Sequence, residues 1–299
     1  MDLSRLTLGL TYTLIPLLFL PLHIRILHVL LVRTEFRSLQ CYRIMIQIQI
    51  FVCLMLPSYI VYGITMLSDT HLLPVTAFLT DLSSSAVMGI NSMDLALGLN
   101  RLKVLFEWRY PNWIDTVPEV ARQCIDSLLQ IVQIMAWIRC FITLVFLITA
   151  IGLDENAVTT GIDIEKTLAV SFGFWSTCIF LAHSSVTLLI YIAIVAFLLY
   201  QKQTTKSTVG SNYERPIPLQ AAVRFCGDSV TGVVFLATFA VDSLRNDKNA
   251  SALLFLIGDL SSLLACVCFS PIVYIALNRT MRKAIFNIAS NSVHRTNLT

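Results

Sequence analysis

Long apolar stretches alternate with short polar connections along most of the chain. A helix that crosses a bilayer needs about 20 mostly apolar residues, and seven stretches meet this requirement. The predicted spans are residues 6–32, 44–67, 74–99, 128–153, 167–200, 219–244 and 250–277. Acidic residues interrupt the third and sixth spans, whereas the fifth has no Asp, Glu, Lys or Arg. The pattern predicts an all-α fold, with residues 1–299 forming a single seven-transmembrane helix bundle.

The composition supports a membrane protein with several spans. Hydrophobic residues make up 56% of the chain and charged residues only 13%, against about 25% charged residues in a typical soluble domain. A soluble fold of this length has too little interior to bury so much apolar surface. The net charge of +3 is small and scattered, so we expect the lipid bilayer, and no nucleic acid, as a partner.

The distribution of Lys and Arg predicts the orientation of the spans. Fifteen of these residues lie in the connections after spans one, three and five and in the C-terminal tail, against four on the opposite side. Loops rich in Lys and Arg stay in the cytoplasm. The N-terminus is therefore predicted outside and the C-terminus inside.

Two motifs mark the predicted inner face. The last span ends in Ser270-Pro271-Ile272-Val273-Tyr274, where the proline removes a backbone donor and kinks the helix. A basic segment, residues 279–289, follows and suits an amphipathic helix on the membrane surface. The third span ends in Asn100-Arg101-Leu102, where Arg101 either holds neighbouring helices together or serves as a positive anchor at the inner face.

These motifs resemble those of rhodopsin-like G-protein-coupled receptors. Pro271 and Tyr274 match the motif Asn-Pro-x-x-Tyr, with Ser270 in place of the asparagine, and Asn100-Arg101-Leu102 is similar to the triplet Asp/Glu-Arg-Tyr. In that triplet the arginine is retained, and an amide stands in place of its acidic neighbour. The resemblance implies that Asn100, Arg101, Pro271 and Tyr274 form a switch that controls the binding of a heterotrimeric G protein.

Further segments narrow the resemblance to the nematode serpentine chemoreceptors, class T in particular. They are Cys41-Tyr42-Arg43-Ile44-Met45, Leu95-Ala96-Leu97 and Asn278-Arg279-Thr280-Met281-Arg282. The resemblance implies an olfactory receptor in the plasma membrane, with the sensory cilium as its expected location. The chain departs from the wider family because it lacks a sodium-binding aspartate in span two, and span six has neither proline nor tryptophan.

Three ionisable residues are candidates for a ligand pocket, because an unpaired charge inside a membrane is costly and is functional by default. Asp259 lies about 16 Å nearer the outside than Ser270 along the last span, where it either pairs with a cationic ligand or is hydrated near the helix end. Asp81 lies near the outer end of span three, where solvation at the loop edge is the competing role. His183 interrupts span five as a ligand contact or as a structural hydrogen-bonding group.

A second set of polar residues predicts an internal network. Asp94 precedes Arg101 by seven residues on the same helix face, too deep for ordinary solvent. We expect it to join Asn91 and Arg139, either as a moving switch or as a static pairing.

The sequence gives little support for a metal site, a cofactor or enzymatic activity. The eight cysteines all lie outside the predicted outer loops, the five histidines are scattered, and no spacing fits a metal site. We therefore expect no metal, no cofactor and no enzymatic activity. Asn249-Ala250-Ser251 is a candidate glycosylation site in a predicted outer loop.

The leading hypothesis is a chemosensory receptor that binds an external small molecule and activates a G protein. The alternative is a membrane transporter or an ion-conducting protein with seven spans. Transporters are commonly built from internal repeats, and the sequence contains no such repeat and an odd number of predicted spans.

Overall fold

The computed structural model describes residues 3–68, 73–109, 119–150, 167–205, 216–240, 248–277 and 279–286. These residues are almost entirely helical and include no strand, which confirms the all-α prediction for this part of the chain. The elements are α1 (Leu3–Val32), α2 (Thr34–Arg37), α3 (Gln40–Ser68), α4 (Leu73–Arg109), α6 (Glu119–Ala150), α7 (Thr167–Thr205), α9 (Pro216–Ala240), α11 (Lys248–Leu263), η1 (Leu264–Phe269), α12 (Ser270–Leu277) and α13 (Arg279–Phe286).

Within the described ranges, five helices are long and apolar enough to cross a membrane. They cover Arg5–Val32, Gln40–Ser68, Asp126–Ile148, Ser171–Phe197 and Leu253–Ile272. A helix satisfies its backbone hydrogen bonds internally, which is what hydrocarbon surroundings demand. The chain therefore has the character of a membrane protein. The predicted third and sixth spans coincide with α4 and α9, which fall outside this set of five.

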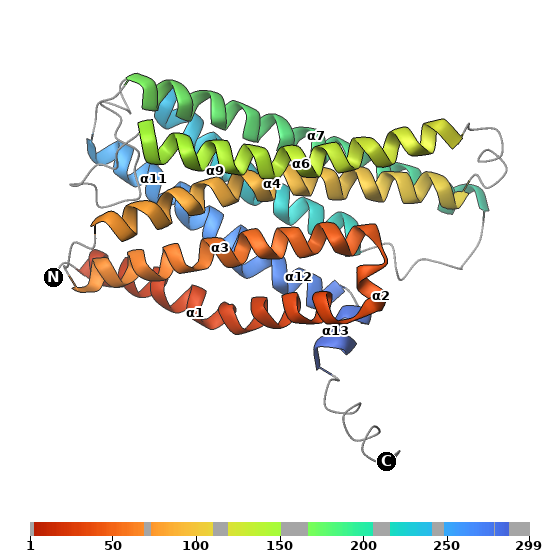
Figure 1. The fold of residues 1–299 in the computed structure, drawn as a ribbon, viewed down its shortest axis with the longest axis horizontal. Coiled ribbons are helices and arrows are strands. Elements are labelled where there is room, and N and C mark those ends of the chain that lie inside the picture. Colours follow the sequence, from red (N-terminus) through yellow and green to blue (C-terminus); the bar gives the residue numbers. More distant parts are fainter. Residues whose placement is uncertain are drawn as a thin grey trace, which may run out of the picture.

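Successive long helices run in alternate directions and pack side by side (Figure 1). The α1 helix packs on α3, α3 packs on α4, and α4 also contacts α6 and α7. On the far side, α7 packs on α9, and α9 packs on α11. Because α4 contacts α3, α6 and α7, it contributes to both hollows described below and to the contact of Arg101.

Several helices extend beyond the predicted spans. The third span was predicted to end at residue 99, but α4 continues to Arg109, so Asn100 and Arg101 lie inside a helix. The fourth was predicted to start at residue 128, but α6 begins at Glu119. Hydropathy marks only the stretch that lies in hydrocarbon, whereas the helical hydrogen bonding continues past it.

The last long helix is interrupted rather than simply kinked. A π-helical segment, η1, separates α11 from α12 and ends two residues before Pro271. Because proline has no backbone N–H, the carbonyl oxygen of Val267, four residues earlier, loses its usual helical donor. The Ser270 hydroxyl donates to the carbonyl oxygen of Ala265 over 3.2 Å. The disturbance predicted at Pro271 is thus spread over the preceding turn, as π-helical segments commonly allow.

The helix α13 follows α12 and lies against α1 (Figure 1). Its side chains Met281, Ala284 and Ile285 are buried, whereas Arg282 and Lys283 are exposed. The Nη2 atom of Arg25 lies 3.5 Å from the carbonyl oxygen of Ile285, to which it donates. The basic amphipathic helix predicted for residues 279–289 is therefore present over Arg279–Phe286, and residues 287–289 lie outside the described part of the chain.

Two glycines allow α1 and α3 to approach closely. A Cβ atom added to Gly63 would lie 2.8 Å from the carbonyl oxygen of Gly9 and 2.3 Å from the hydroxyl of Thr13. Small residues at helix contacts are a common device in membranes, because association there depends on close van der Waals packing. This contact fixes the spacing of α1 and α3.

We predict that Gly63→Ala destabilises the protein by about 1–3 kcal/mol, because the new methyl group forces α1 away from α3. Thermal unfolding in detergent, followed by a dye that reacts with buried cysteines such as Cys140 and Cys266, measures the change. Gly98→Ala is the matched control, since its added Cβ would meet the nearest atom at an ordinary 3.6 Å. Equal melting temperatures for the two variants would contradict the prediction.

Candidate functional site

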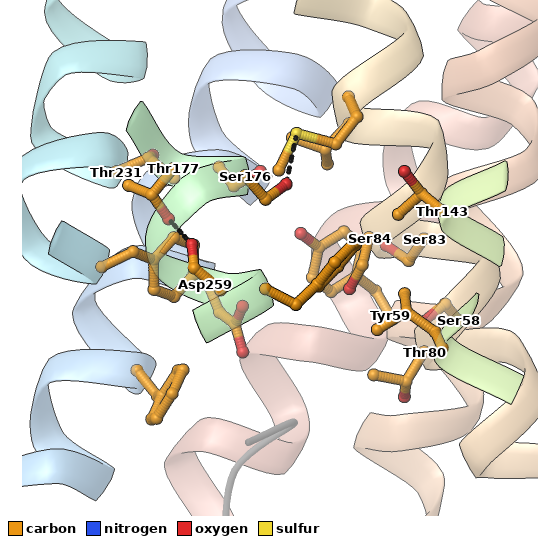
Figure 2. A pocket seen from close by; sticks show the side chains of 18 residues that line it. Ser58, Tyr59, Thr80, Ser83, Ser84, Thr143, Ser176, Thr177, Thr231 and Asp259 are labelled. Carbon is orange, nitrogen blue, oxygen red and sulfur yellow. Dashed lines mark hydrogen bonds between the residues drawn. The ribbon is translucent and has the colours of Figure 1, made fainter. Parts of the chain in front are cut away.

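A cavity of about 110 Å³ lies inside the bundle, among α3, α4, α6, α7, α9 and α11 (Figure 2). A dry apolar cavity of similar size, about 150 Å³, accepts a molecule such as benzene. Small polar side chains and apolar side chains share the wall. The polar lining comprises Ser58, Tyr59, Thr80, Ser83, Ser84, Thr143, Ser176, Thr177, Thr231, Asp259 and Ser262, and the apolar lining includes Val87, Met88, Leu147, Phe172, Phe235 and Phe255. Such a mixture suits a small ligand that is held by a few directed hydrogen bonds.

The hydroxyl groups of this wall bond partly to their own helices. Thr177 donates to the carbonyl oxygen of Gly173 over 2.8 Å, and Thr231 donates to that of Gly227 over 3.0 Å. Thr231 also shares a 2.6 Å hydrogen bond with Ser261. A hydroxyl that donates its proton to the backbone keeps acceptor lone pairs. The wall is therefore suited to a ligand that donates hydrogen bonds.

Asp259 is the one carboxylate among the described residues that line the cavity. It lies within electrostatic range of Tyr12, Tyr59 and Tyr62. The rings of Tyr12 and Tyr59 stack with centroids 5.9 Å apart, and Tyr62 meets Tyr12 edge-on at 5.4 Å. An acid beside aromatic rings is a chemically sound arrangement for a cationic group, which gains from both.

The other two residues predicted for a ligand pocket lie elsewhere. Asp81 is buried on α4 but is absent from the cavity lining, and its backbone carbonyl accepts a hydrogen bond from Ser85. His183 lies on α7 and lines a second hollow that faces α6, and it is absent from the lining of the central cavity. The three candidates therefore do not form one site, and Asp259 alone lines the central cavity.

The predicted network of Asn91, Asp94 and Arg139 is divided in the structure. The Nδ2 atom of Asn91 donates to the hydroxyl of Ser184 over 2.7 Å and so joins α4 to α7. Arg139 on α6 bonds instead to Ser92 and His183. Asp94 lies within electrostatic range of Tyr191 on α7.

Arg101 joins α4 to α7 towards their C-terminal ends. Its Nη1 atom donates to the phenol oxygen of Tyr191 over 3.0 Å, and its guanidinium carbon lies 5.6 Å from the centroid of that ring. Asn100 beside it is buried. Arg101 thus does contact a neighbouring helix, and its partner is a tyrosine that sequence reasoning missed. A tyrosine within the otherwise apolar stretch of α7 was the available signal.

A second cation of α4 lies two residues after Arg101. Lys103 pairs with Asp126 on α6, and the Lys103 side chain is 13% exposed and that of Asp126 45% exposed. Because this pair joins α4 to α6, Lys103 offers a control position for the loss of a positive charge close to Arg101 in the chain.

A further polar junction went unrecognised in the sequence. The imidazole of His23 is fully buried, with Nε2 3.0 Å from the carbonyl oxygen of Val267 and Nδ1 2.9 Å from Oε1 of Gln49. This carbonyl is the one that Pro271 leaves without a helical donor. Because a carbonyl only accepts, Nε2 carries the proton, and α1 replaces the bond missing from the last helix.

The orientation of the Gln49 amide follows from the same contacts. With the amide oxygen towards His23, the Nε2 atom of Gln49 has no hydrogen-bond partner among the described residues. With the amide nitrogen towards His23, Gln49 donates to Nδ1 and His23 is neutral. We assign this orientation because a neutral imidazole costs far less than a charged one inside a membrane.

Two predicted residues belong to described helices, but their side chains lie outside the described part of the chain. Tyr274 belongs to α12, three residues after Pro271. Asn249, the candidate glycosylation site, belongs to the first turn of α11.

A scan against models of known protein families finds no match for this chain, and a search of curated proteins finds no similar sequence.

We predict that His23→Leu destabilises the protein by about 1–3 kcal/mol, because the buried carbonyl of Val267 loses its donor. The cost should fall in a Pro271→Ala background, since an alanine at this position supplies a backbone N–H. A double-mutant cycle on thermal unfolding in detergent measures this coupling.

His28→Leu is the matched control, because His28 is an exposed histidine of the same helix. If His23→Leu costs the same with Pro271 present or replaced, His23 does not act through the Val267 carbonyl.

Proposed function

We propose that this chain is a chemosensory G-protein-coupled receptor, which binds an external small molecule and activates a heterotrimeric G protein. The observation that carries the proposal is the polar cavity among six helices, with Asp259 in its wall. A ligand in such a cavity contacts α3, α4, α6, α7, α9 and α11 at once. It is therefore placed to change how these helices pack against one another.

The proposed topology has seven spans in the plasma membrane, with the N-terminus outside. The two helices beyond the five apolar ones, α4 and α9, complete the seven. Both helices pack against several neighbours. Helix α4 contacts α3, α6 and α7, and α9 contacts α7 and α11. Helices surrounded by protein tolerate polar residues that helices exposed to lipid do not, which supports including them as spans.

The proposed mechanism joins the cavity to the inner face through α4. This one helix carries the cavity residues Thr80 and Met88 and also Arg101, which contacts Tyr191 on α7. Arg101 is 13 residues beyond Met88 in the sequence, or about 20 Å along the axis. A ligand shifts the equilibrium only if it binds one packing of the helices better than the other. In the proposed active state the Arg101–Tyr191 contact opens and the G protein binds where the helices separate.

Transport is the second candidate, and one observation favours it. The interruption at η1 places non-α backbone at membrane depth, and discontinuous helices form the substrate sites of many transporters. Flux of a ligand into vesicles that contain the purified chain, without any G protein, would favour transport over signalling.

The direct test is activation of a G protein in cells that express the chain, screened with volatile and water-soluble amines. We predict that Asp259→Asn lowers the response to an active amine at least about tenfold, as expected for the loss of a desolvated charge pair. Asp81→Asn makes the same chemical change outside the cavity and should respond as the unaltered chain does. Equal losses in the two variants, with equal surface expression, would refute binding at Asp259.

We also predict that Tyr191→Phe raises signalling without ligand, because it removes only the oxygen that accepts from Arg101. A hydrogen bond to a charged group contributes about 1.5–3 kcal/mol, which corresponds to a shift of about 10-fold or more in the balance of the two states. Basal G-protein activation at matched surface expression measures it. Lys103→Gln is the control, because it removes a different positive charge of α4. Arg101→Gln removes the other partner of the contact. Unchanged basal activity in both Tyr191→Phe and Arg101→Gln would rule out this contact as a restraint.

A further inference from the structure

A second hollow, the lateral crevice, lies between α4, α6 and α7. Its volume is about 490 Å³, several times that of the central cavity. Its apolar walls come mainly from α6 and α7, and the polar side chains of Ser92, Arg139 and His183 also line it. The lining side chains Ile131, Met135, Ile138, Ile142, Trp175 and Ile179 are exposed on the outside of the bundle. In a membrane this outside is the lipid, so the crevice opens towards the bilayer.

Arg139 carries a positive charge that no acid neutralises in the described part of the chain. Its Nη1 atom donates to Nδ1 of His183 over 3.1 Å and lies 3.4 Å from the hydroxyl of Ser92. Its Nη2 atom lies 3.3 Å from the sulfur of Met88. Because a guanidinium group only donates, Nδ1 of His183 accepts, and its proton is on Nε2. All three partners are neutral.

The depth of Arg139 makes this charge unusual. It lies within the apolar stretch Asp126–Ile148, nine residues before the end, or about 14 Å along the helix. A cation at such a depth is costly unless something compensates it. Phosphate groups of the bilayer remain at its surface, whereas the carboxylate of a lipid-soluble acid is carried inward by its own apolar chain.

The crevice and the central cavity meet. Thr143, Phe172 and Ser176 line both. Met88, a cavity residue, accepts from Arg139 and also from the hydroxyl of Ser176 over 3.7 Å (Figure 2). An occupant that draws the guanidinium group away from Met88 therefore alters the wall of the cavity.

We propose that the lateral crevice binds a long-chain carboxylate that enters from the bilayer, with its carboxylate paired to Arg139 and its chain along the apolar walls of α6 and α7. This site is distinct from the amine-binding cavity around Asp259, and it does not depend on signalling.

The test is photolabelling of the purified full-length chain in phosphatidylcholine nanodiscs. The probe is palmitic acid that carries a diazirine, and the comparison probe is palmityl alcohol with the same group. We expect the acid to label crevice peptides of α6 and α7 and to be displaced by unlabelled palmitate but not by butyrate. Labelling should fall about tenfold or more in Arg139→Gln and persist in Arg139→Lys, which keeps the charge.

A second pair of variants tests the crevice itself. Ile179→Trp fills it, whereas Ile192→Trp adds the same bulk to an exposed position of α7 outside the lining. Only Ile179→Trp should reduce labelling. Equal labelling by the acid and the alcohol on the unaltered chain would overturn the proposal even if Arg139→Gln fails to fold. Displacement by butyrate would overturn entry from the bilayer, and labelling outside α4, α6 and α7 would overturn the site.

Discussion

The bond from His23 to the carbonyl oxygen of Val267 illustrates the constraint on which this bundle depends. Hydrocarbon offers no hydrogen-bond partner, so each polar group at membrane depth must find one inside the protein. Pro271 leaves that carbonyl without a donor, and a histidine from the first helix supplies one across the bundle. The same rule accounts for Asn91 bonding to Ser184 and for Gln47 bonding to Gln133. Buried polar residues thus add specific bonds between helices that apolar packing also holds together.

Helix α4 carries several of the polar residues that need partners inside the protein. It carries part of the central cavity, the Asn91 bond to α7 and the Arg101–Tyr191 contact. Its polar positions explain why it is less apolar than the five helices that satisfy a simple hydropathy test. A helix that contacts protein on several sides can hold such residues, because its neighbours provide the partners that lipid lacks. The contacts of α4 with several neighbouring helices therefore explain why its composition can be more polar.

The two hollows differ in charge and in access. The central cavity is small, is lined by hydroxyl groups and contains an acid, Asp259. The lateral crevice is larger, apolar and contains a base, Arg139. Opposite charges favour opposite ligands, so the two proposed sites differ in electrostatics as well as in size. Met88 contacts Arg139 while lining the cavity, and it links the two hollows together with Thr143, Phe172 and Ser176, which line both.

The sequence by itself determined the helices, because the length of apolar stretch that crosses a bilayer is a local property. It also determined the basic surface helix after Pro271, since an amphipathic pattern is visible without a fold. It further indicated that Asp259, Arg101 and Arg139 are charged residues in or at the ends of predicted spans, which need partners. Only the tertiary structure decided their partners. Arg101 meets Tyr191, ninety positions later in the chain, and His23 meets Val267 across more than two hundred. It also decided that Asp259, Asp81 and His183 lie in three different places. Such pairings depend on how each helix is rotated and how deep it lies relative to its neighbours. The packing of the whole bundle sets this rotation and depth, and no local sequence pattern encodes them.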